Sequence, residues 1–306
     1  MDIREELKKR ILILDGGMGT FIQQKGIKYD GNNDALCITR PDIIYDIHKA
    51  YVDAGADIIS TCTFGANAIS QEGYNMQDRV GEMNRAAVSI ARKAADTAGR
   101  NVWVMGSIGP SPKSLFIIEM MMDPAETLNF DLLTRAYYTQ ADALAEGGVD
   151  GFLVETITDM RNAEAALTAI RRVQQERGTD LPVMVSASIM NTSGCLMTGV
   201  PLRELYDGVS EYRPMSFGLN CSFGGKELYP IVKEIAEFVK CAISIFPNAG
   251  LPTARGYEEK PCDTADYLER MAADRLINIA GGCCGTTPGH IREIANRLQG
   301  AAPRIF

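Results

Sequence analysis

Histidine is nearly absent from this sequence, which holds only His48 and His290, both within helical patterns. We expect these two rings at the surface or at helix ends, rather than as metal ligands or catalytic bases. A mechanism that depends on a histidine general base is therefore disfavoured.

Positive charge is also scarce, since 31 Lys and Arg residues face 39 Asp and Glu residues and give a formal net charge of −8. With no basic run, this balance argues against a nucleic-acid partner. No window approaches the ~18 consecutive apolar residues that a membrane span needs, and the charged residues 1–10 lack the apolar core of a signal peptide. Eight cysteines without such a signal indicate a reducing compartment. We therefore expect a soluble, cytoplasmic protein.

Short apolar runs alternate eight times with amphipathic helical patterns, without an interrupting linker. Runs that are apolar on both faces suit a parallel sheet covered by helices. Eight such units in about 250–300 residues predict a (β/α)8 TIM barrel, an α/β fold with its active site at the C-terminal ends of the strands. A doubly wound sheet is the alternative. The expected strands are residues 11–14, 57–61, 102–106, 151–155, 183–188, 216–220, 242–246 and 276–280. The clearest helical stretches are residues 43–54, 83–98, 131–146, 163–175, 231–239 and 291–298.

The even series of units predicts a single domain over residues 1–306. Residues 1–10 are charged and helical in pattern, so we expect an N-terminal helical extension there. Residues 299–306 follow the last helical pattern, and we expect either a tail or the start of a linker.

Polar residues and glycines gather at the predicted C-terminal end of every run. Because these ends meet at one rim of a barrel, segments far apart in the sequence are expected to share one site. The segments are residues 15–20, 62–67, 107–110, 155–156, 191–194, 220–221, 247–250 and 282–284.

Three of the cysteines on this rim suggest a metal site: Cys221 after the sixth run, and the adjacent Cys283 and Cys284 after the eighth. A disulfide between the two neighbours would be strained, because their Cα atoms are ~3.8 Å apart and disulfides prefer ~5.5 Å. Three thiolates without a fourth sulfur nearby predict a zinc site with one open position. The four cysteines that do not follow a strand end are interpreted as buried core residues or free thiols. These are Cys37, Cys195, Cys241 and Cys262.

Two carboxylates belong to the same rim. Glu155 ends an apolar run and is expected to point into the barrel mouth, where its charge needs a cationic partner. A substrate ammonium would serve, and so would a nearby arginine. Asp15 begins a glycine-rich segment and is equally consistent with a helix N-cap or a turn. That segment lacks the Lys-Ser/Thr pair of a phosphate-binding P-loop.

Seven motifs, taken together, resemble those of the zinc-dependent homocysteine S-methyltransferase family. The resemblance covers nearly the whole chain, from about residue 11 to residue 298, and is strongest to the homocysteine-binding module of cobalamin-dependent methionine synthase. The motifs are Asp-Gly-Gly-Met-Gly-Thr from Asp15, Ala-Gly-Ala-Asp-Ile-Ile from Ala54, Thr-Phe-Gly-Ala from Thr63, Gly-Ser-Ile-Gly-Pro from Gly106, Glu155-Thr156, Asn220-Cys221, and Gly-Gly-Cys-Cys-Gly-Thr-Thr-Pro from Gly281.

The resemblance implies an enzyme that moves a methyl group from a methylated corrinoid to the thiolate of L-homocysteine, giving methionine. It implies Zn²⁺ held by Cys221, Cys283 and Cys284, with the substrate sulfur in the fourth position. It also implies that Asp15 and Glu155 hold the substrate ammonium.

For the substrate carboxylate, the resemblance implies backbone amides of the loop around Gly16 and Gly17 and of the loop after the second strand, around Thr61 and Cys62. It implies that Asn248 fills the open zinc position when substrate is absent. Cys62 stands where relatives usually carry asparagine, which places a spare thiol near the mouth.

No cobalamin-binding motif of the Asp-x-His-x-x-Gly type is present in the chain. Methylcobalamin or another methylcorrinoid would therefore arrive on another chain, on further domains, or as free cofactor. The apolar residues from Leu115 to Met122 lie on the same rim and are expected either to dock a corrinoid-carrying partner or to form an extra helical turn packed on the barrel.

Three alternatives stay open for the reaction. The donor could be S-methylmethionine or another small molecule, or the acceptor could be a different thiol. The third alternative is a structural or metal-storage barrel, which would have a closed zinc site.

Overall fold

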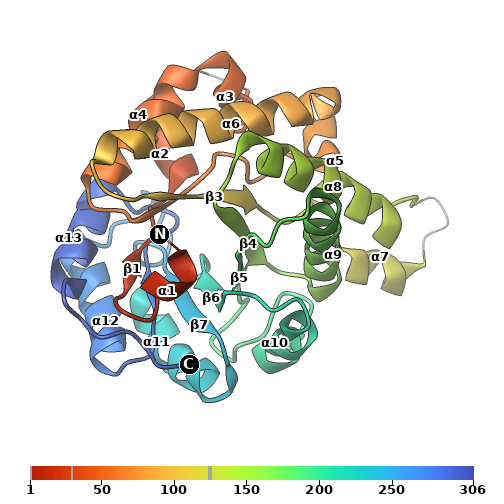
Figure 1. The fold of residues 1–306 in the computed structure, drawn as a ribbon. Helices are drawn as coiled ribbons and strands as arrows, with labels where there is room; N and C mark the ends of the chain where they lie inside the picture. The colour runs from red at the N-terminus through yellow and green to blue at the C-terminus, as the bar shows by residue number, and fades with distance from the viewer. Residues whose placement is uncertain (1, 29, 123–125) are drawn as a thin grey trace.

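The computed structural model describes residues 2–28, 30–122 and 126–306 as eight parallel strands surrounded by helices (Figure 1). Each strand pairs with its neighbours in the order β1-β8-β7-β6-β5-β4-β3-β2, and a parallel bridge between Leu14 and Ile58 joins β1 to β2. The predicted (β/α)8 barrel is therefore confirmed. The strands are β1 (Leu12–Ile13), β2 (Ile58–Ser60), β3 (Trp103–Ile108), β4 (Gly151–Ile157), β5 (Val183–Ala187), β6 (Ser216–Asn220), β7 (Ala242–Phe246) and β8 (Ile279–Ala280).

Apart from α1, the helices lie outside the sheet and surround it (Figure 1). The helices are α1 (Ile3–Glu6), α2 (Met18–Gln24), α3 (Leu36–Thr39), α4 (Pro41–Asp53), α5 (Ala68–Glu72), α6 (Val80–Ala95), α7 (Leu115–Met121), α8 (Phe130–Gly147), α9 (Met160–Arg177), α10 (Leu202–Ser210), α11 (Gly225–Phe238), α12 (Pro261–Ala273) and α13 (Pro288–Leu298), with short 3-10 turns η1 (Gln77–Arg79) and η2 (Asp96–Ala98). None of the helices within the described ranges is long and apolar enough to cross a membrane.

Every expected strand is present, but several helices begin earlier than the apolar pattern indicates. Helix α9 starts at Met160 because the Asp159 carboxylate caps it and accepts the N–H groups of Arg161 and Asn162. Helix α11 starts at Gly225, so Pro230 lies inside the helix rather than before it. Capping residues are polar and thus fall outside a pattern that counts only buried positions.

The barrel interior holds an apolar core separate from the one between sheet and helices. Ile3 and Leu7, from α1 and the residue after it, are buried in this interior core beside Trp103 and Met215. The N-terminal extension predicted at residues 1–10 is thus a plug across the N-terminal end of the barrel, with Met1 outside the described residues. Figure 1 shows α1 in front of the strands.

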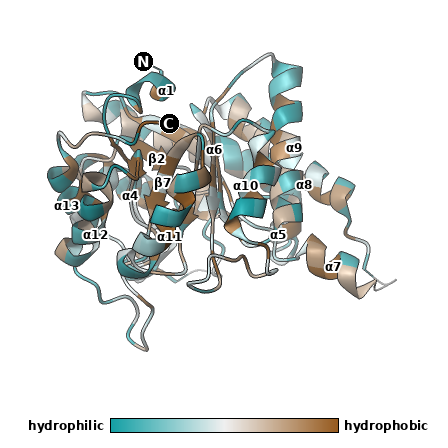
Figure 2. Ribbon diagram, turned by 90° about the horizontal axis from the view of Figure 1, so that it is seen from below, coloured by the Kyte–Doolittle hydropathy of each residue, from teal (hydrophilic) through white to brown (hydrophobic). Residues whose placement is uncertain are grey.

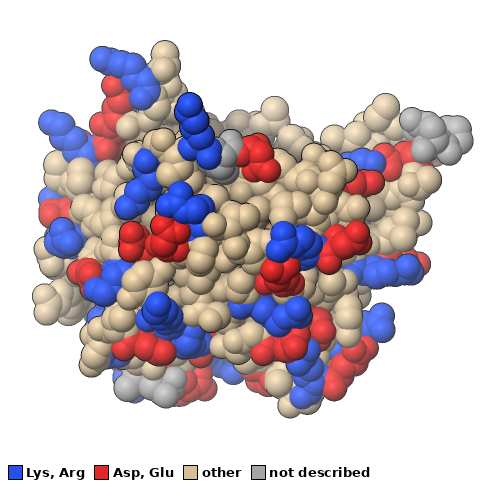
Figure 3. Space-filling view, turned by 90° about the horizontal axis from the view of Figure 1, so that it is seen from above, with Lys and Arg blue, Asp and Glu red and all other residues tan. Residues whose placement is uncertain are grey.

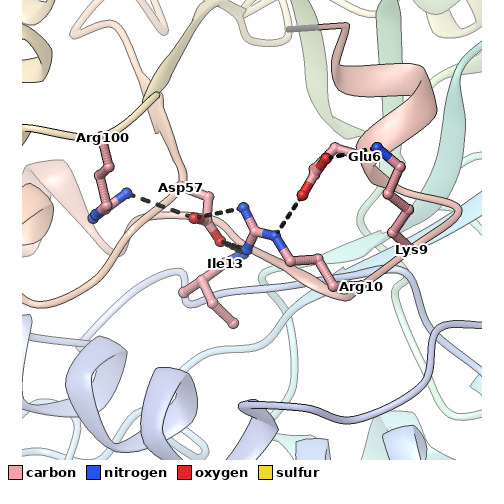
Figure 4. Close-up of polar contacts among 6 residues, drawn as sticks. All are labelled: Glu6, Lys9, Arg10, Ile13, Asp57 and Arg100. Carbon is pink, nitrogen blue, oxygen red and sulfur yellow. Dashed lines mark hydrogen bonds and ion pairs between the residues drawn. The ribbon is translucent and has the colours of Figure 1, made fainter.

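The seam between β1 and β2 is closed by aspartate side chains as well as by backbone. Near the N-terminal end, the Asp57 carboxylate accepts the Ile13 N–H at 3.0 Å and pairs with Arg10 at 2.8 Å and Arg100 at 3.5 Å (Figure 4). Near the C-terminal end, the Asp15 carboxylate accepts the Ser60 N–H at 2.8 Å. At this short seam, two carboxylates therefore accept backbone N–H groups that a neighbouring strand would otherwise bond.

Residues 299–306 fold back along the barrel. The Arg304 guanidinium donates to the carbonyl oxygens of Ala236, Val239 and Cys241, and its own carbonyl accepts from Asn278 at 2.8 Å. This segment, expected to be a tail or linker, is anchored at least as far as Arg304.

Charges on the face formed by α4 and α6 alternate in sign, without an extended patch of one kind (Figure 3). Many of them pair locally, as in Arg79–Glu82 at 2.8 Å and Arg85–Glu146 at 3.1 Å. This face offers no basic stripe of the kind that binds nucleic acid.

The Asp57 seam generates a stability prediction. Asp57→Ala leaves the Ile13 N–H without its acceptor and two arginines without their shared partner, so the free energy of unfolding should fall by about 2 kcal/mol. Chemical denaturation followed by circular dichroism measures this change. The matched control is Glu146→Ala, which removes a half-exposed ion pair and should cost less than about 0.5 kcal/mol. Equal losses in the two variants would contradict the role given to the seam.

Candidate metal centre and substrate cavity

A cavity of about 260 Å³ opens at the C-terminal ends of the strands. Its floor is the top of the interior core, formed by Leu14, Leu153 and Phe246. Its walls bring together nine of the ten site residues predicted from the sequence. These are Asp15, Gly16, Gly17, Thr61, Cys62, Glu155, Cys221, Cys283 and Cys284.

Three sulfur atoms meet on one side of this cavity. The Sγ atoms of Cys221, Cys283 and Cys284 all lie within 4.8 Å of one another, and those of Cys221 and Cys284 are 3.9 Å apart. Hydrogen bonds from Cys283 and Cys284 lower the pKa of the Cys221 thiol to about 3, and the contact with Cys221 raises the pKa of each partner. Three sulfurs this close cannot all ionise unless a cation lies among them.

The cluster fits a zinc ion. Ligands at ~2.3 Å in a tetrahedron around zinc have sulfur atoms ~3.8 Å apart, close to the 3.9 Å between Cys221 and Cys284. Within the part of the chain that the structure describes, no other group of three His, Cys, Asp or Glu residues comes together in this way. All the remaining cysteines are free thiols, in line with the sequence interpretation.

The backbone around the sulfurs is unusual. Cys221 and Ser222 both have positive φ angles, 61° and 59°, and the Phe223 N–H donates to the Cys221 carbonyl at 2.6 Å. Non-glycine residues in this left-handed region are strained, by an amount of order 1–3 kcal/mol each. The loop after β6 therefore holds Cys221 in a conformation that the sequence alone would not select.

Gly17 permits the loop after β1 to lie directly against the loop after β8. A Cβ atom added at Gly17 would be 2.6 Å from the Cys283 carbonyl oxygen. The Gly17 N–H donates to Thr286 Oγ1 at 3.1 Å, and a Cβ at Gly16 would meet the same Thr286 oxygen at 2.8 Å. The glycines thus bring the loop that follows Asp15 against the loop that carries Cys283 and Cys284.

The Asp15 carboxylate reaches across to β2, where both the N–H and the Oγ of Ser60 donate to it. It is neither a helix N-cap nor a turn residue, the two alternatives that the sequence left open. Burial raises the pKa of Asp15 to about 8, against the lowering effect of the Ser60 hydrogen bonds.

Glu155 points into the cavity and accepts a hydrogen bond from Ser107 Oγ at 2.5 Å. Burial raises the pKa of Glu155 to about 7. The alternative of a neighbouring arginine is wrong, because none of the described lysines or arginines pairs with Glu155 or lines the cavity. The cavity therefore lacks its own cation for this carboxylate.

A third carboxylate, the buried Asp34, also lines the cavity and was not identified from the sequence. The Gly65 N–H donates to both of its oxygens, at 3.3 and 3.2 Å, and Gln71 Nε2 donates to one at 3.2 Å. Burial raises its pKa to about 7. No periodic pattern covers the segment between β1 and α4, so the sequence offered no signal for its path.

The other predicted residues differ in position. Thr61 Oγ1 accepts the Ser107 N–H at 3.0 Å, and Cys62 is a buried thiol in the cavity wall, as the sequence suggested. Asn248 is not among the residues that line the cavity, but its side chain contacts the cluster. Its Oδ1 accepts the Cys284 N–H at 3.1 Å, and a hydrogen bond from its side chain helps to lower the pKa of the Cys221 thiol. In this structure Asn248 therefore supports a cysteine loop from outside the cavity.

Neither histidine belongs to the site. The expectation of a surface position is wrong for His48, which is fully buried in α4, and burial lowers its pKa to about 4. His290 is at a helix end as expected, where it completes a capping box with Thr287 at the start of α13.

Several large apolar side chains are exposed at the end of the barrel where the cavity opens, and Phe64 also lines the cavity. Figure 2 shows α7 projecting from the end of the barrel opposite α1, and Met120 and Met121 of this helix are 65% and 67% exposed. Leu115 is buried and anchors the helix. The exposed large apolar side chains in other loops at this end of the barrel are Phe64, Met190, Met197 and Leu251.

Comparison with known proteins agrees with this geometry. The sequence model of the family described as homocysteine S-methyltransferase matches residues 12–298. The homocysteine methyltransferase MmuM from Escherichia coli, in its metallated form, is similar in fold, with a TM-score of 0.78, 21% identity, and coverage of 97% of this chain and 100% of that chain. Its oxidized form gives a TM-score of 0.76 at 20% identity, covering 94% of this chain and 96% of that chain.

The contact between the two loops generates a second prediction. Gly17→Ala places a methyl group against the Cys283 carbonyl, so it should lower the free energy of unfolding by about 1–3 kcal/mol. The control is Gly73→Ala, where an added Cβ meets nothing within 4 Å and stability should hold or rise by a few tenths of a kcal/mol, up to about 1. Urea denaturation of both variants measures the difference. A neutral Gly17→Ala would show that the loops do not depend on this close approach.

Proposed function

The chain belongs to the homocysteine S-methyltransferase family, and from that premise we propose that it transfers a methyl group from a methylated corrinoid to L-homocysteine, with zinc as cofactor, giving methionine. The observation that carries the proposal is the cluster of three cysteine sulfurs in one cavity with two carboxylates, Asp15 and Glu155, that have no lysine or arginine partner among the described lining residues. The whole of residues 1–306 would act as one homocysteine-binding domain in a reducing compartment such as the cytoplasm, where the thiols stay reduced.

Cys221, Cys283 and Cys284 would hold the metal. When bound, zinc supplies the Lewis acidity that converts the substrate thiol, with a usual pKa of ~8.5, into a thiolate at neutral pH. The cavity residues then need no general base, in agreement with the absence of histidine from its walls. The three cysteines and the described open space beside them leave room for a substrate sulfur.

Asp15 and Glu155 would hold the other end of the substrate. Asp15 is buried and Glu155 is partly buried, both accept hydrogen bonds from serines, and neither has an arginine or lysine partner among the described residues that line the cavity. An ammonium group would provide the missing positive charge and lower both pKa values on binding. The cavity would thereby orient homocysteine with its amino group at β1 and β4 and its sulfur at β6 and β8.

The methyl group that is transferred must come from a donor outside this cavity. The exposed apolar side chains at this end of the barrel suit docking of a protein that presents a bulky donor over the mouth, so we favour a corrinoid-carrying domain or protein. The homocysteine thiolate attacks the methyl carbon, the cobalt–carbon bond breaks with both electrons staying on cobalt, and methionine forms. S-Methylmethionine as donor is the second candidate.

A donor assay tests the proposal. Zinc-loaded protein, homocysteine and free methylcobalamin are mixed without oxygen, and the corrinoid spectrum follows loss of the methyl group. Cys283→Ser should reduce the rate by about 100-fold or more because it removes a metal ligand. Cys262→Ser changes an exposed cysteine away from the cavity and should leave the rate unchanged.

Two outcomes would contradict the proposal in different ways. Transfer from S-methylmethionine but not from methylcobalamin would assign a small sulfonium donor. Equal rates in the Cys283→Ser variant and the unaltered protein would show that the cysteine cluster takes no part.

The buried carboxylates generate a pH prediction. An ammonium group binds the ionised forms of these carboxylates. The pKa values of the free protein are about 8 for Asp15 and about 7 for Glu155, so at lower pH each carboxyl must lose a proton before it can bind the ammonium. Binding of L-methionine, which has no thiol to titrate, should therefore weaken as the pH falls from 8.5 to 6.5, by up to about tenfold per unit for each protonated group. Calorimetry at several pH values measures this. Asp15→Asn should bind more weakly at pH 8.5 and depend less on pH, whereas a flat wild-type profile would remove these carboxylates from the ammonium site.

Helix α7 generates a prediction about the partner. If a corrinoid protein docks there, the double variant Phe116→Ser, Met121→Ser should weaken its affinity by about tenfold, through loss of apolar contact area. Transfer from free methylcobalamin should be unaffected, which separates docking from chemistry. Unchanged affinity for the carrier would leave α7 as an extra helix packed on the barrel.

A further inference from the structure

Asn220 is buried at the end of β6, directly before Cys221, with 1% of its surface exposed. Its Oδ1 accepts Ser186 Oγ at 2.7 Å and the Thr156 N–H at 3.0 Å. Its Nδ2 donates to Thr156 Oγ1 at 2.8 Å and to Cys283 Sγ at 3.7 Å. A side-chain amide has two N–H donors and two acceptor positions, and all four are used here. One side chain thus joins β4, β5 and the cysteine loop after β8.

The bonds to Thr156 fix an irregular piece of backbone. Thr156 has a φ of 58°, and the pairing of β4 with β5 shifts register between Val154 and Ile157. A bulge of this kind re-aims neighbouring side chains and leaves backbone groups out of the ladder. The Asn220 Oδ1 accepts the Thr156 N–H that the bulge frees from the strand ladder. The residue before Thr156 is Glu155, which lines the cavity.

The bond to Cys283 acts at the other end of the site. An N–H group directed at a sulfur favours the thiolate over the thiol and fixes the rotamer of the cysteine. None of the other hydrogen bonds described for the Cys283 sulfur comes from outside the cluster of three cysteines. Among the described residues, Asn220 is therefore the hydrogen-bond donor to the Cys283 sulfur that comes from outside the cysteine cluster.

We propose that Asn220 is a positioning residue that sets the Cys283 sulfur for the metal and the Glu155 carboxylate for the substrate ammonium at the same time. This inference rests on the proposed function and deepens it. The two ends of the amino-acid substrate would thereby be held in fixed register by one amide, without contact between Asn220 and the substrate.

The test measures the two ends separately, without a methyl donor. Zinc affinity is obtained by competition with a chromophoric chelator, and the thiolate-to-cobalt absorption of the Co²⁺-loaded protein reports the sulfur environment. Affinity for L-methionine, measured by calorimetry, reports the ammonium site. Asn220→Ala should weaken zinc binding by ~10-fold to ~100-fold, as loss of an outer partner of a metal ligand does, shift the cobalt band, and weaken methionine binding by a similar factor.

Two further variants make the result specific. Asn220→Asp keeps the shape and the Oδ1 acceptor but replaces the N–H groups, so it should lose zinc affinity like Asn220→Ala, and it carries the test if the alanine variant does not fold. Ser216→Ala removes another buried polar group of β6, which contacts Ser244 and not the site, and should leave both affinities within about twofold.

The outcomes distinguish the positioning role of Asn220 from the proposed function on which it rests. A folded Asn220 variant with unchanged zinc affinity or unchanged methionine affinity would overturn the positioning role while leaving the proposed function intact. A wild-type protein that binds no zinc would overturn both. Parallel loss in both Asn220 variants, with Ser216→Ala unaffected, is the expected result.

Discussion

Repulsion among three neighbouring sulfur atoms is the constraint around which the C-terminal end of this barrel is built. Cys221, Cys283 and Cys284 have Sγ atoms within 4.8 Å of one another, a spacing that only a shared cation makes favourable for three thiolates. The surrounding loops adopt a strained backbone conformation and a close approach to hold the three sulfurs together. Cys221 is held at positive φ, and Gly17 admits the neighbouring loop to within contact of the Cys283 backbone.

Buried carboxylates form the complementary half of the site. Asp15 and Glu155 face the cavity without an arginine or lysine among its described lining residues, so burial raises the pKa of each above its usual range. Under the proposed function, two cations would complete the site: a metal at the sulfurs and a substrate ammonium at the carboxylates. Asn220 connects the halves, because the same amide contacts Cys283 and the bulge that carries Glu155.

The sequence was sufficient for the barrel and for the cysteines, because strand periodicity places all C-terminal strand ends on one rim. Glycine spacing and strand ends also located Asp15 and Glu155, though not their serine partners. What the sequence could not supply were contacts between distant strands. Asp34 lies in a segment without periodicity, and the four bonds of Asn220 depend on a bulge in β4 that no local signal marks. The buried position of His48 was likewise missed, because helical periodicity shows which residues share a helix face but not how deeply that face is buried.

The most direct measurement is the number of sulfur ligands on zinc, determined by X-ray absorption at the zinc edge with and without homocysteine. The account predicts three sulfurs per zinc in the protein alone and four after homocysteine is added, with the three cysteines retained. An unchanged sulfur count, under conditions where homocysteine is shown by calorimetry to be bound, would contradict the claim that the substrate thiol completes this site.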